Sequence, residues 1–112
     1  MNAKEKASVI YNALEEKKAM NIKAIDISSL SPIADYFVIA SASNVNQLMA
    51  FVEQIEEDLV KEKIHSPKTE GKRGSGWVLM DYGDVVVHLF LQDEREFYDI
   101  ERIWADAPEA VL

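Results

Sequence analysis

Two aspartates that follow a Gly-Ser pair come closest to a catalytic pattern in this chain. Gly74 and Ser75 precede Asp81 and Asp84 in the sequence. In nucleotidyl transfer, paired carboxylates hold two divalent ions that assist an in-line attack on a phosphate. Such carboxylates normally stand two residues apart on one strand, because alternate side chains share a face. Asp81 and Asp84 instead flank an expected turn at residues 82–83, so their spacing does not predict a metal site.

The histidines and serines offer no second route to catalysis. His65 and His88 have no further ligand at metal-binding spacing, and the chain contains no cysteine. Ser41, Ser43 and Ser75 have no base beside them in a nucleophile pattern. We therefore expect no catalytic residue, no metal and no cofactor. His88 is expected to be a hydrogen-bonded structural residue of a strand.

The basic side chains concentrate in one stretch that lacks aromatic neighbours. They are Lys61, Lys63, His65, Lys68, Lys72 and Arg73. Single-stranded nucleic acid is commonly bound by basic grooves that carry aromatic rings, on which the bases stack. The lack of rings favours a solvated loop, and a minor contact with RNA is the alternative.

The last third of the chain combines aromatic rings with carboxylates. The rings belong to Trp77, Tyr82, Phe97, Tyr98 and Trp104, and the carboxylates to Asp81, Asp84, Asp93, Glu94, Glu96 and Asp99. Rings supply contact area at low entropy cost, and carboxylates steer a basic partner. This segment predicts a protein-binding surface. Phe97 and Trp104 are assigned to the core, whereas core packing and partner contact both stay open for Trp77 and Tyr98.

Length and charge are consistent with a small intracellular domain. The chain has 112 residues and a formal net charge of −8, which suits one domain and a basic partner better than bare nucleic acid. No apolar run approaches the roughly 20 residues that span a bilayer. We expect a cytoplasmic protein without a membrane segment.

The first half of the chain should contain two helices and two strands. Apolar residues recur at helical spacing over residues 2–18, and a second helix begins after an N-cap at Ser43 or Asn44. Residues 22–27 alternate as a half-buried strand does, and the apolar run 36–40 predicts an interior strand. The buried face of the second helix should consist of Leu48, Phe51, Val52, Ile55 and Leu59.

The second half should contain a loop and a hairpin. Residues 64–76 predict a surface loop with room for a short strand before Pro67. Residues 77–81 and 84–91 flank a glycine-bearing turn and predict an antiparallel hairpin.

One further helix should close the chain. Asp93 is the expected N-cap, with Glu96 completing a capping box. Its buried face should consist of Phe97, Ile100, Ile103 and Trp104. The tail after Pro108 should fray. Together these elements predict one α/β domain over residues 1–112, ordered over about 2–108, in which helices pack on a mixed sheet.

Three blocks of the sequence resemble the Iojap family of ribosomal silencing factors. Residues 34–41 read ADYFVIAS, residues 77–88 read WVLMDYGDVVVH, and residues 94–104 read EREFYDIERIW. The ending DAP at residues 106–108 also resembles that family. The blocks keep the family's order and spacing over nearly the whole chain.

This resemblance implies a fold, a partner and a mode of action. The fold would be nucleotidyltransferase-like, without the catalytic residues. The partner would be basic ribosomal protein number fourteen of the large ribosomal subunit. A bound domain would block joining of the small subunit and repress translation under poor nutrition. Some members of the family form homodimers, so self-association is a further expectation. The alternative is an enzyme with a degenerate or active nucleotidyltransferase site.

Carried over residue by residue, the resemblance implies a docking surface on the hairpin and the last helix. The expected partner-binding residues are Trp77, Met80, Asp81, Tyr82, Asp84, His88, Glu94, Arg95 and Tyr98. Because alternate strand residues point to opposite faces, these side chains cannot all face the same way.

Overall fold

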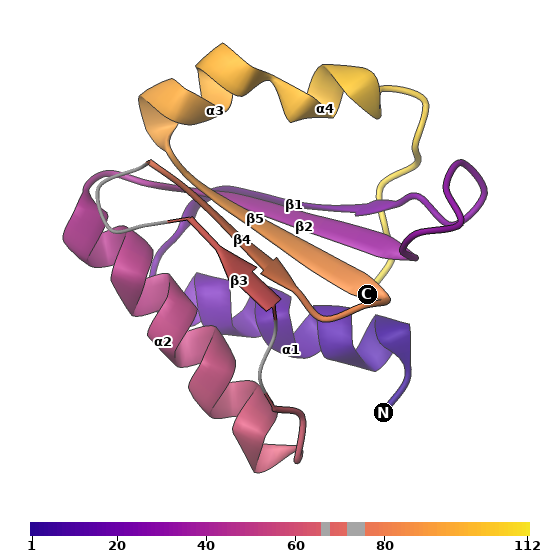
Figure 1. Ribbon diagram of the computed structural model, residues 1–112, viewed down its shortest axis with the longest axis horizontal. Helices are drawn as coiled ribbons and strands as arrows, with labels where there is room; N and C mark the ends of the chain where they lie inside the picture. Colours follow the sequence, from indigo (N-terminus) through magenta and orange to yellow (C-terminus); the bar gives the residue numbers. More distant parts are fainter. Residues whose placement is uncertain (66–67, 72–75) are drawn as a thin grey trace.

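A mixed five-stranded sheet organises the described part of the chain, which comprises residues 1–65, 68–71 and 76–112 of the computed structural model (Figure 1). The strands are β1 (Met20–Asp26), β2 (Tyr36–Ala42), β3 (Lys68–Glu70), β4 (Trp77–Asp81) and β5 (Val85–Leu91). Their order across the sheet is β1-β2-β5-β4-β3. β2 and β5 are parallel, and the other neighbours are antiparallel. The predicted mixed α/β sheet is confirmed.

Helices cover both faces of this sheet. The long helices α1 (Ala3–Glu16) and α2 (Val45–Lys61) lie on one face, and the short helices α3 (Gln92–Tyr98) and α4 (Ile100–Ile103) lie over the other (Figure 1). Among the described residues, no helix combines the length and apolarity needed to cross a membrane. The two faces therefore differ in how much apolar helix surface covers them.

The helix α1 begins as its sequence favours and ends earlier than predicted. Asn2 caps it, and the Glu5 side chain bonds back to the Asn2 amide in a capping box. The helix stops at Glu16, because Lys18 adopts a left-handed conformation with φ 60°. β1 consequently begins at Met20, two residues before the predicted strand.

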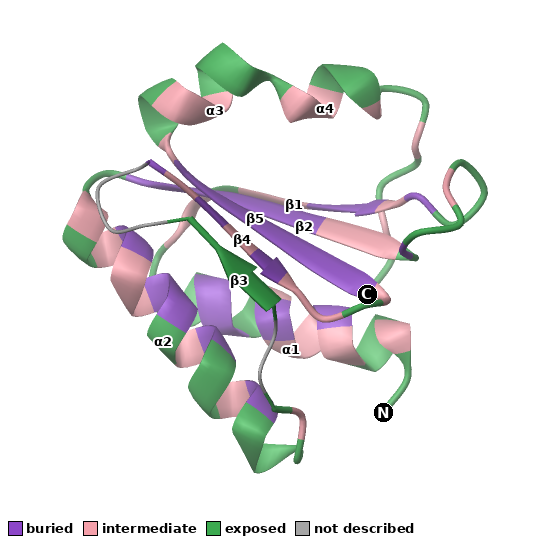
Figure 2. Cartoon of the chain, viewed as in Figure 1, coloured by how far each residue is buried: buried purple, intermediate pink, exposed green. Residues whose placement is uncertain are grey.

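The predicted apolar stripe of α2 forms the centre of the larger core. The Asn44 side chain accepts a hydrogen bond from the Gln47 amide, which confirms one of the two expected caps. All five predicted residues, Leu48, Phe51, Val52, Ile55 and Leu59, are buried. Figure 2 shows this buried stripe on the side of α2 that faces the sheet.

Alternation along β5 separates two apolar clusters. Val85, Val87 and Leu89 join the cluster beneath α1 and α2. Val86 and Phe90 join the cluster on the face of α3 and α4. Every residue of β5 except Leu91 is buried, because the strand lies centrally in the sheet and is covered on both faces. This alternation decides which of the predicted docking residues share a surface.

Two edge segments differ from the sequence-based prediction. The short strand β3 follows Pro67 instead of preceding it, and it pairs with β4. The tail does not fray where expected: Pro108 accepts a hydrogen bond from the Asp26 amide, and the Ala110 amide donates to Ala24, each at 2.9 Å. Long-range backbone pairing of this kind leaves no local pattern in the sequence.

The last predicted helix is two short helices. Asp99 is left-handed, with φ 46° and ψ 49°, and separates α3 from α4. α3 starts after Leu91, which makes no side-chain cap, so Asp93 is not the N-cap. The break turns Phe97 and Ile103 outward, where they are 78% and 75% exposed. Their predicted burial was wrong, because one continuous helix was assumed.

Candidate docking surface

The contact between Trp77 and Tyr98 forms the centre of the candidate docking surface. Their ring centroids lie 4.6 Å apart, and the Trp77 ring stacks on Phe90 at 5.1 Å. Trp77 begins β4 and is half-buried, whereas Tyr98 ends α3 and is 44% exposed. The junction of β4 with α3 therefore presents large rings to solvent.

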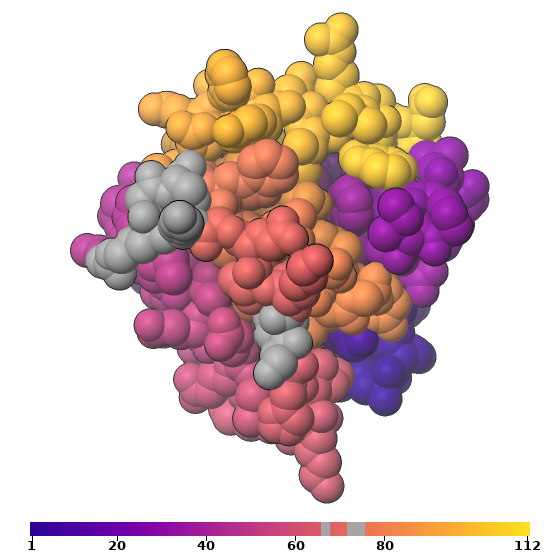
Figure 3. Space-filling model, viewed as in Figure 1, coloured from indigo at the N-terminus to yellow at the C-terminus, as the bar shows by residue number. Residues whose placement is uncertain are grey.

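Two further side chains extend this junction into a continuous surface. Phe97 meets Tyr98 edge to face at 5.2 Å. Leu79 and Trp77, together with Glu70, line a hollow of about 230 Å³ beside β3. We call Trp77, Leu79, Phe97 and Tyr98 the aromatic surface. In Figure 3, β3 and β4 lie near the centre of the visible face and α3 lies directly above them.

Carboxylates border the aromatic surface. Glu70 contributes to the wall of the hollow. Glu94 of α3 packs over Gly76, since a Cβ added at Gly76 would lie 2.6 Å from the Glu94 Cγ. Asp81 follows Trp77 and Leu79 in the alternation of β4, and its carboxylate accepts a hydrogen bond from the Gly83 amide. Acidic groups beside exposed rings suit a basic protein partner.

His88 supports the aromatic surface from behind. It lies opposite Leu79 in the sheet and is 6% exposed. The Trp77 Nε1 donates to its Nδ1 at 3.3 Å, and Phe37 packs edge to face against its ring at 4.8 Å. Burial lowers the pKa of His88 to about 4. His88 is thus a neutral, hydrogen-bonded strand residue, and its burial removes it from the predicted contact set.

Met80 and Tyr82 point away from the aromatic surface. Met80 is fully buried in the cluster beneath α1 and α2. Tyr82 packs against the same cluster, and burial raises the pKa of its phenol. Its Oη has no hydrogen-bond partner among the described residues. The predicted docking role of the buried Met80 is corrected. Tyr82 is only half-buried but lies on the same face as Met80, because side chains alternate between the two faces of the hairpin.

Asp84 belongs to the junction of the hairpin with α1. Its carboxylate forms an ion pair with the Lys6 Nζ at 2.7 Å. Its carbonyl oxygen accepts hydrogen bonds from the amides of Asp35 and Tyr36. These contacts hold the turn against the rest of the fold, and they lie at the opposite end of β5 from Trp77, which pairs with Phe90.

Arg95 is engaged inside the protein. Its Nη1 donates to the Asn21 carbonyl at 2.6 Å and to the Ser41 Oγ at 2.9 Å. Its Nε bonds to Glu101 at 2.7 Å, and the side chain is 12% exposed. The Nε and Nη1 groups of Arg95 are therefore engaged in contacts within the protein.

Asp81 and Asp84, the two aspartates of the possible nucleotidyl-transfer pattern, bind different parts of the protein and do not form a metal site together. Asp81 bonds to the turn, whereas Asp84 bonds to α1. Across residues 1–65, 68–71 and 76–112, the structure places no group of three or more His, Cys, Asp or Glu together as metal ligands. Gly74 and Ser75, the other half of the nucleotidyl-transfer pattern, lie outside the described residues.

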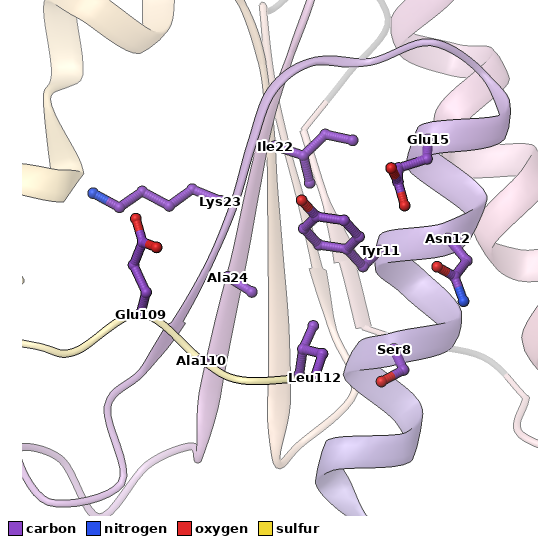
Figure 4. Close-up of a pocket in the computed structure, with 10 residues that line it drawn as sticks. All are labelled: Ser8, Tyr11, Asn12, Glu15, Ile22, Lys23, Ala24, Glu109, Ala110 and Leu112. Atoms are coloured by element: carbon purple, nitrogen blue, oxygen red, sulfur yellow. The ribbon is translucent and has the colours of Figure 1, made fainter.

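A second hollow lies between α1, β1 and the tail (Figure 4). It has a volume of about 430 Å³. Tyr11 projects into it from α1, and Leu112 reaches it from the tail (Figure 4). Its remaining lining is largely polar, with Glu15 on α1 and Lys23 on β1. This hollow exists because the tail pairs with β1. The sequence did not predict it, because the tail was expected to fray.

Leu79 and Phe97 were absent from the predicted set although they belong to the aromatic surface. Leu79 could have been identified, because strict alternation places it beside Trp77. Phe97 could not, because its helical spacing assigned it to a buried face and only the break at Asp99 exposes it.

Comparison with known proteins adds a family and a set of related chains. The family model described as ribosomal silencing factor during starvation matches residues 1–112. A relative from Bacillus subtilis, named as a ribosomal silencing factor, is 39% identical over all of this chain and 95% of its own. A mouse protein named for mitochondrial assembly of the ribosomal large subunit is 31% identical over 93% of this chain and 47% of its own. A crystal structure from Chromobacterium violaceum superposes with a TM-score of 0.89 at 31% identity, covering 94% of this chain and 88% of that one.

Proposed function

This chain belongs to the family of ribosomal silencing factors during starvation, and from that premise we propose that it binds the large ribosomal subunit and keeps the small subunit from joining. Family membership makes ribosome-associated silencing of translation its function. The name of the mouse relative, which refers to the ribosomal large subunit, supports the choice of subunit. The activity would be exerted in the cytoplasm.

The observation that carries the proposal is an exposed aromatic surface with an acidic border. Trp77 and Tyr98 would be the anchors, because large rings at the centre of an interface contribute most of its energy. Asp81 and Glu94 would steer a basic partner toward them. Basic ribosomal protein fourteen of the large subunit has the chemistry that this surface would select. Contact with rRNA would be minor, since the protein carries a net charge of −8.

Silencing by occlusion needs no catalytic turnover. The protein measures 33 × 33 × 22 Å along its principal axes. A rigid body of that size, held on the face where the subunits meet, would occupy the volume that the small subunit must enter. We infer a non-enzymatic repressor. Self-association would compete with docking only if a second copy covered the same rings.

Replacing Tyr98 with Ala tests the anchor. The variant removes a half-exposed ring from the surface and should weaken large-subunit binding at least roughly tenfold, the loss expected for an interface anchor. Pull-down against separated ribosomal subunits measures this loss, and light scattering measures whether added protein reduces subunit joining. The sheet and both buried clusters should remain intact, because Tyr98 belongs to neither cluster.

Ile33 provides a matched control for that experiment. Its side chain is 80% exposed in the loop between β1 and β2, at the far side of the sheet from β4. Ile33→Ala should bind and silence as the wild type does. Equal binding by the Tyr98 variant would remove the aromatic surface from the interface. Failure of the wild type to bind large subunits would overturn the proposed function itself.

A further inference from the structure

We propose that Arg95 is a positioning residue, whose guanidinium holds α3 across the sheet so that Tyr98 rests on Trp77. Arg95 would thus control docking without touching the partner. This inference rests on the proposed function, because the position of Tyr98 matters through the aromatic surface.

The contacts of Arg95 join α3 to three other elements. Nη1 reaches the Asn21 carbonyl of β1 and the fully buried Ser41 hydroxyl of β2. Nε reaches Glu101 of α4. All three donor–acceptor distances fall between 2.6 and 2.9 Å. A planar guanidinium can satisfy several acceptors in fixed directions, which makes it suited to holding one element against others.

α3 depends on such tertiary contacts for its position. It has seven residues, none of them buried, and its N-cap makes no side-chain hydrogen bond. An isolated helix of this length is not stable in water, because nucleation costs more than one turn of hydrogen bonds returns. Its orientation must therefore come from side chains that reach the sheet.

Arg95 and Tyr98 hold α3 from different strands. Residues three apart in a helix lie on neighbouring positions of one face. Arg95 reaches β1 and β2, whereas Tyr98 packs on Trp77 of β4 and Phe90 of β5. Together the two side chains span four of the five strands. Loss of the guanidinium would leave α3 held mainly by the ring contacts of Tyr98 with Trp77 and Phe90. The helix could then pivot on the sheet, and Tyr98 would no longer be held in place over Trp77.

Glu101 completes the arrangement across the break between the two short helices. The hydrogen bond from Arg95 holds the pKa of the Glu101 carboxyl below its usual range. Lys23 approaches the second carboxylate oxygen at 3.8 Å. Because Glu101 stays ionised, its hydrogen bond to Arg95 is charge-assisted and directional. The Arg95 contacts therefore fix α4 together with α3.

Trp77 fluorescence tests the positioning directly and without a ribosome. In a Trp104→Phe background, Trp77 is the only tryptophan. Arg95→Ala should shift the Trp77 emission to the red, because the Tyr98 ring that covers Trp77 moves away. Tyr98→Ala, which removes that ring, should give a shift in the same direction. Arg102→Ala is the matched control, since this arginine is exposed on α4 and should leave the emission unchanged. Glu101→Gln, a milder change, should give a smaller shift in the same direction. Unchanged emission in both Arg95→Ala and Glu101→Gln would overturn the proposal.

Binding to large subunits supplies the second test, as a double-mutant cycle. Arg95→Ala should weaken binding roughly tenfold. The double variant with Tyr98→Ala should bind no more weakly than Tyr98→Ala alone, because both act through one ring. Additive losses would mean that Arg95 contacts the partner itself, and would overturn the positioning role. If the wild type ignores large subunits, the proposed function fails, whereas the fluorescence result still decides the role of Arg95.

Discussion

At the scale of single residues, His88, which supports the aromatic surface through Trp77, should make the free energy of unfolding depend on pH. Burial lowers its pKa to about 4, whereas an unfolded chain would have a histidine pKa near 6.5. Between these values the unfolded chain takes up a proton and the native protein does not. Stability contributed by neutral His88 is therefore complete above about pH 6.5 and is lost as the pH falls toward 4. The loss should be on the order of 3 kcal/mol.

Urea unfolding of wild type and His88→Gln between pH 7 and pH 4 would measure this contribution. The free energy of unfolding should fall more steeply with decreasing pH in the wild type, because the variant has no proton to bind at this site. His65→Gln, which replaces an exposed histidine, is the matched control variant. Parallel curves for wild type and His88→Gln would show that the pKa of His88 in the native protein is not lowered.

At the scale of elements, two glycines allow the turns around β4 that bring the aromatic surface together. Gly71 and Gly83 both have positive φ, at 107° and 89°. A Cβ at Gly71 would overlap the carbonyl oxygen of Trp77, whereas a Cβ at Gly83 would meet nothing within 4 Å. The two sites thus share a positive φ and differ in the space around the Cα atom.

Alanine substitution at these two glycines separates backbone strain from steric overlap. Gly83→Ala should lower the free energy of unfolding by about 1 kcal/mol, the cost of a left-handed alanine. Gly71→Ala should cost more and should also shift Trp77 emission, because the chain beside β4 must move. Chemical denaturation and fluorescence of both variants provide the measurement. Equal costs at the two sites would show that the chain beside Gly71 relaxes freely.

The short helices show how element-scale differences arise. Helical spacing over residues 93–104 predicts one helix, but the left-handed conformation of Asp99 breaks it. Aspartate adopts a left-handed conformation more readily than most residues. The sequence therefore permits the break at Asp99 but does not by itself predict it. Tertiary contacts of Trp104 with Phe37 at 5.2 Å favour the broken path, because they hold the end of α4 against β2.

At the scale of the whole molecule, the charge of −8 should influence how fast docking occurs. Carboxylates near the aromatic surface attract a basic partner over distances that salt shortens to about 10 Å at 0.1 M. Association measured by stopped flow should slow as salt rises. Glu94→Gln should reduce that salt dependence, whereas Glu53→Gln on α2, across the sheet, should not. A salt-independent rate would remove steering from the mechanism.

Much of the fold follows from periodic patterns that act within a few residues. The stripe of α2 and the hairpin of β4 and β5 were predictable, because burial imposes a period of 3.6 or 2 on apolar residues. The family was likewise recognisable from three ordered blocks of sequence. Its nucleotidyltransferase-like fold label stays an expectation drawn from that resemblance.

The candidate site was only partly predictable, and Met80 and Arg95 show why. Both occur in the segments expected to dock, yet Met80 faces α1 and α2 and Arg95 bonds to β1 and β2. Sequence alone determined which segments carry the rings and the acids of this protein. Tertiary structure decided which of them reach solvent together, because that depends on which helices cover each face of the sheet and on contacts between residues far apart in the sequence, such as Asn21 and Arg95, which are 74 positions apart.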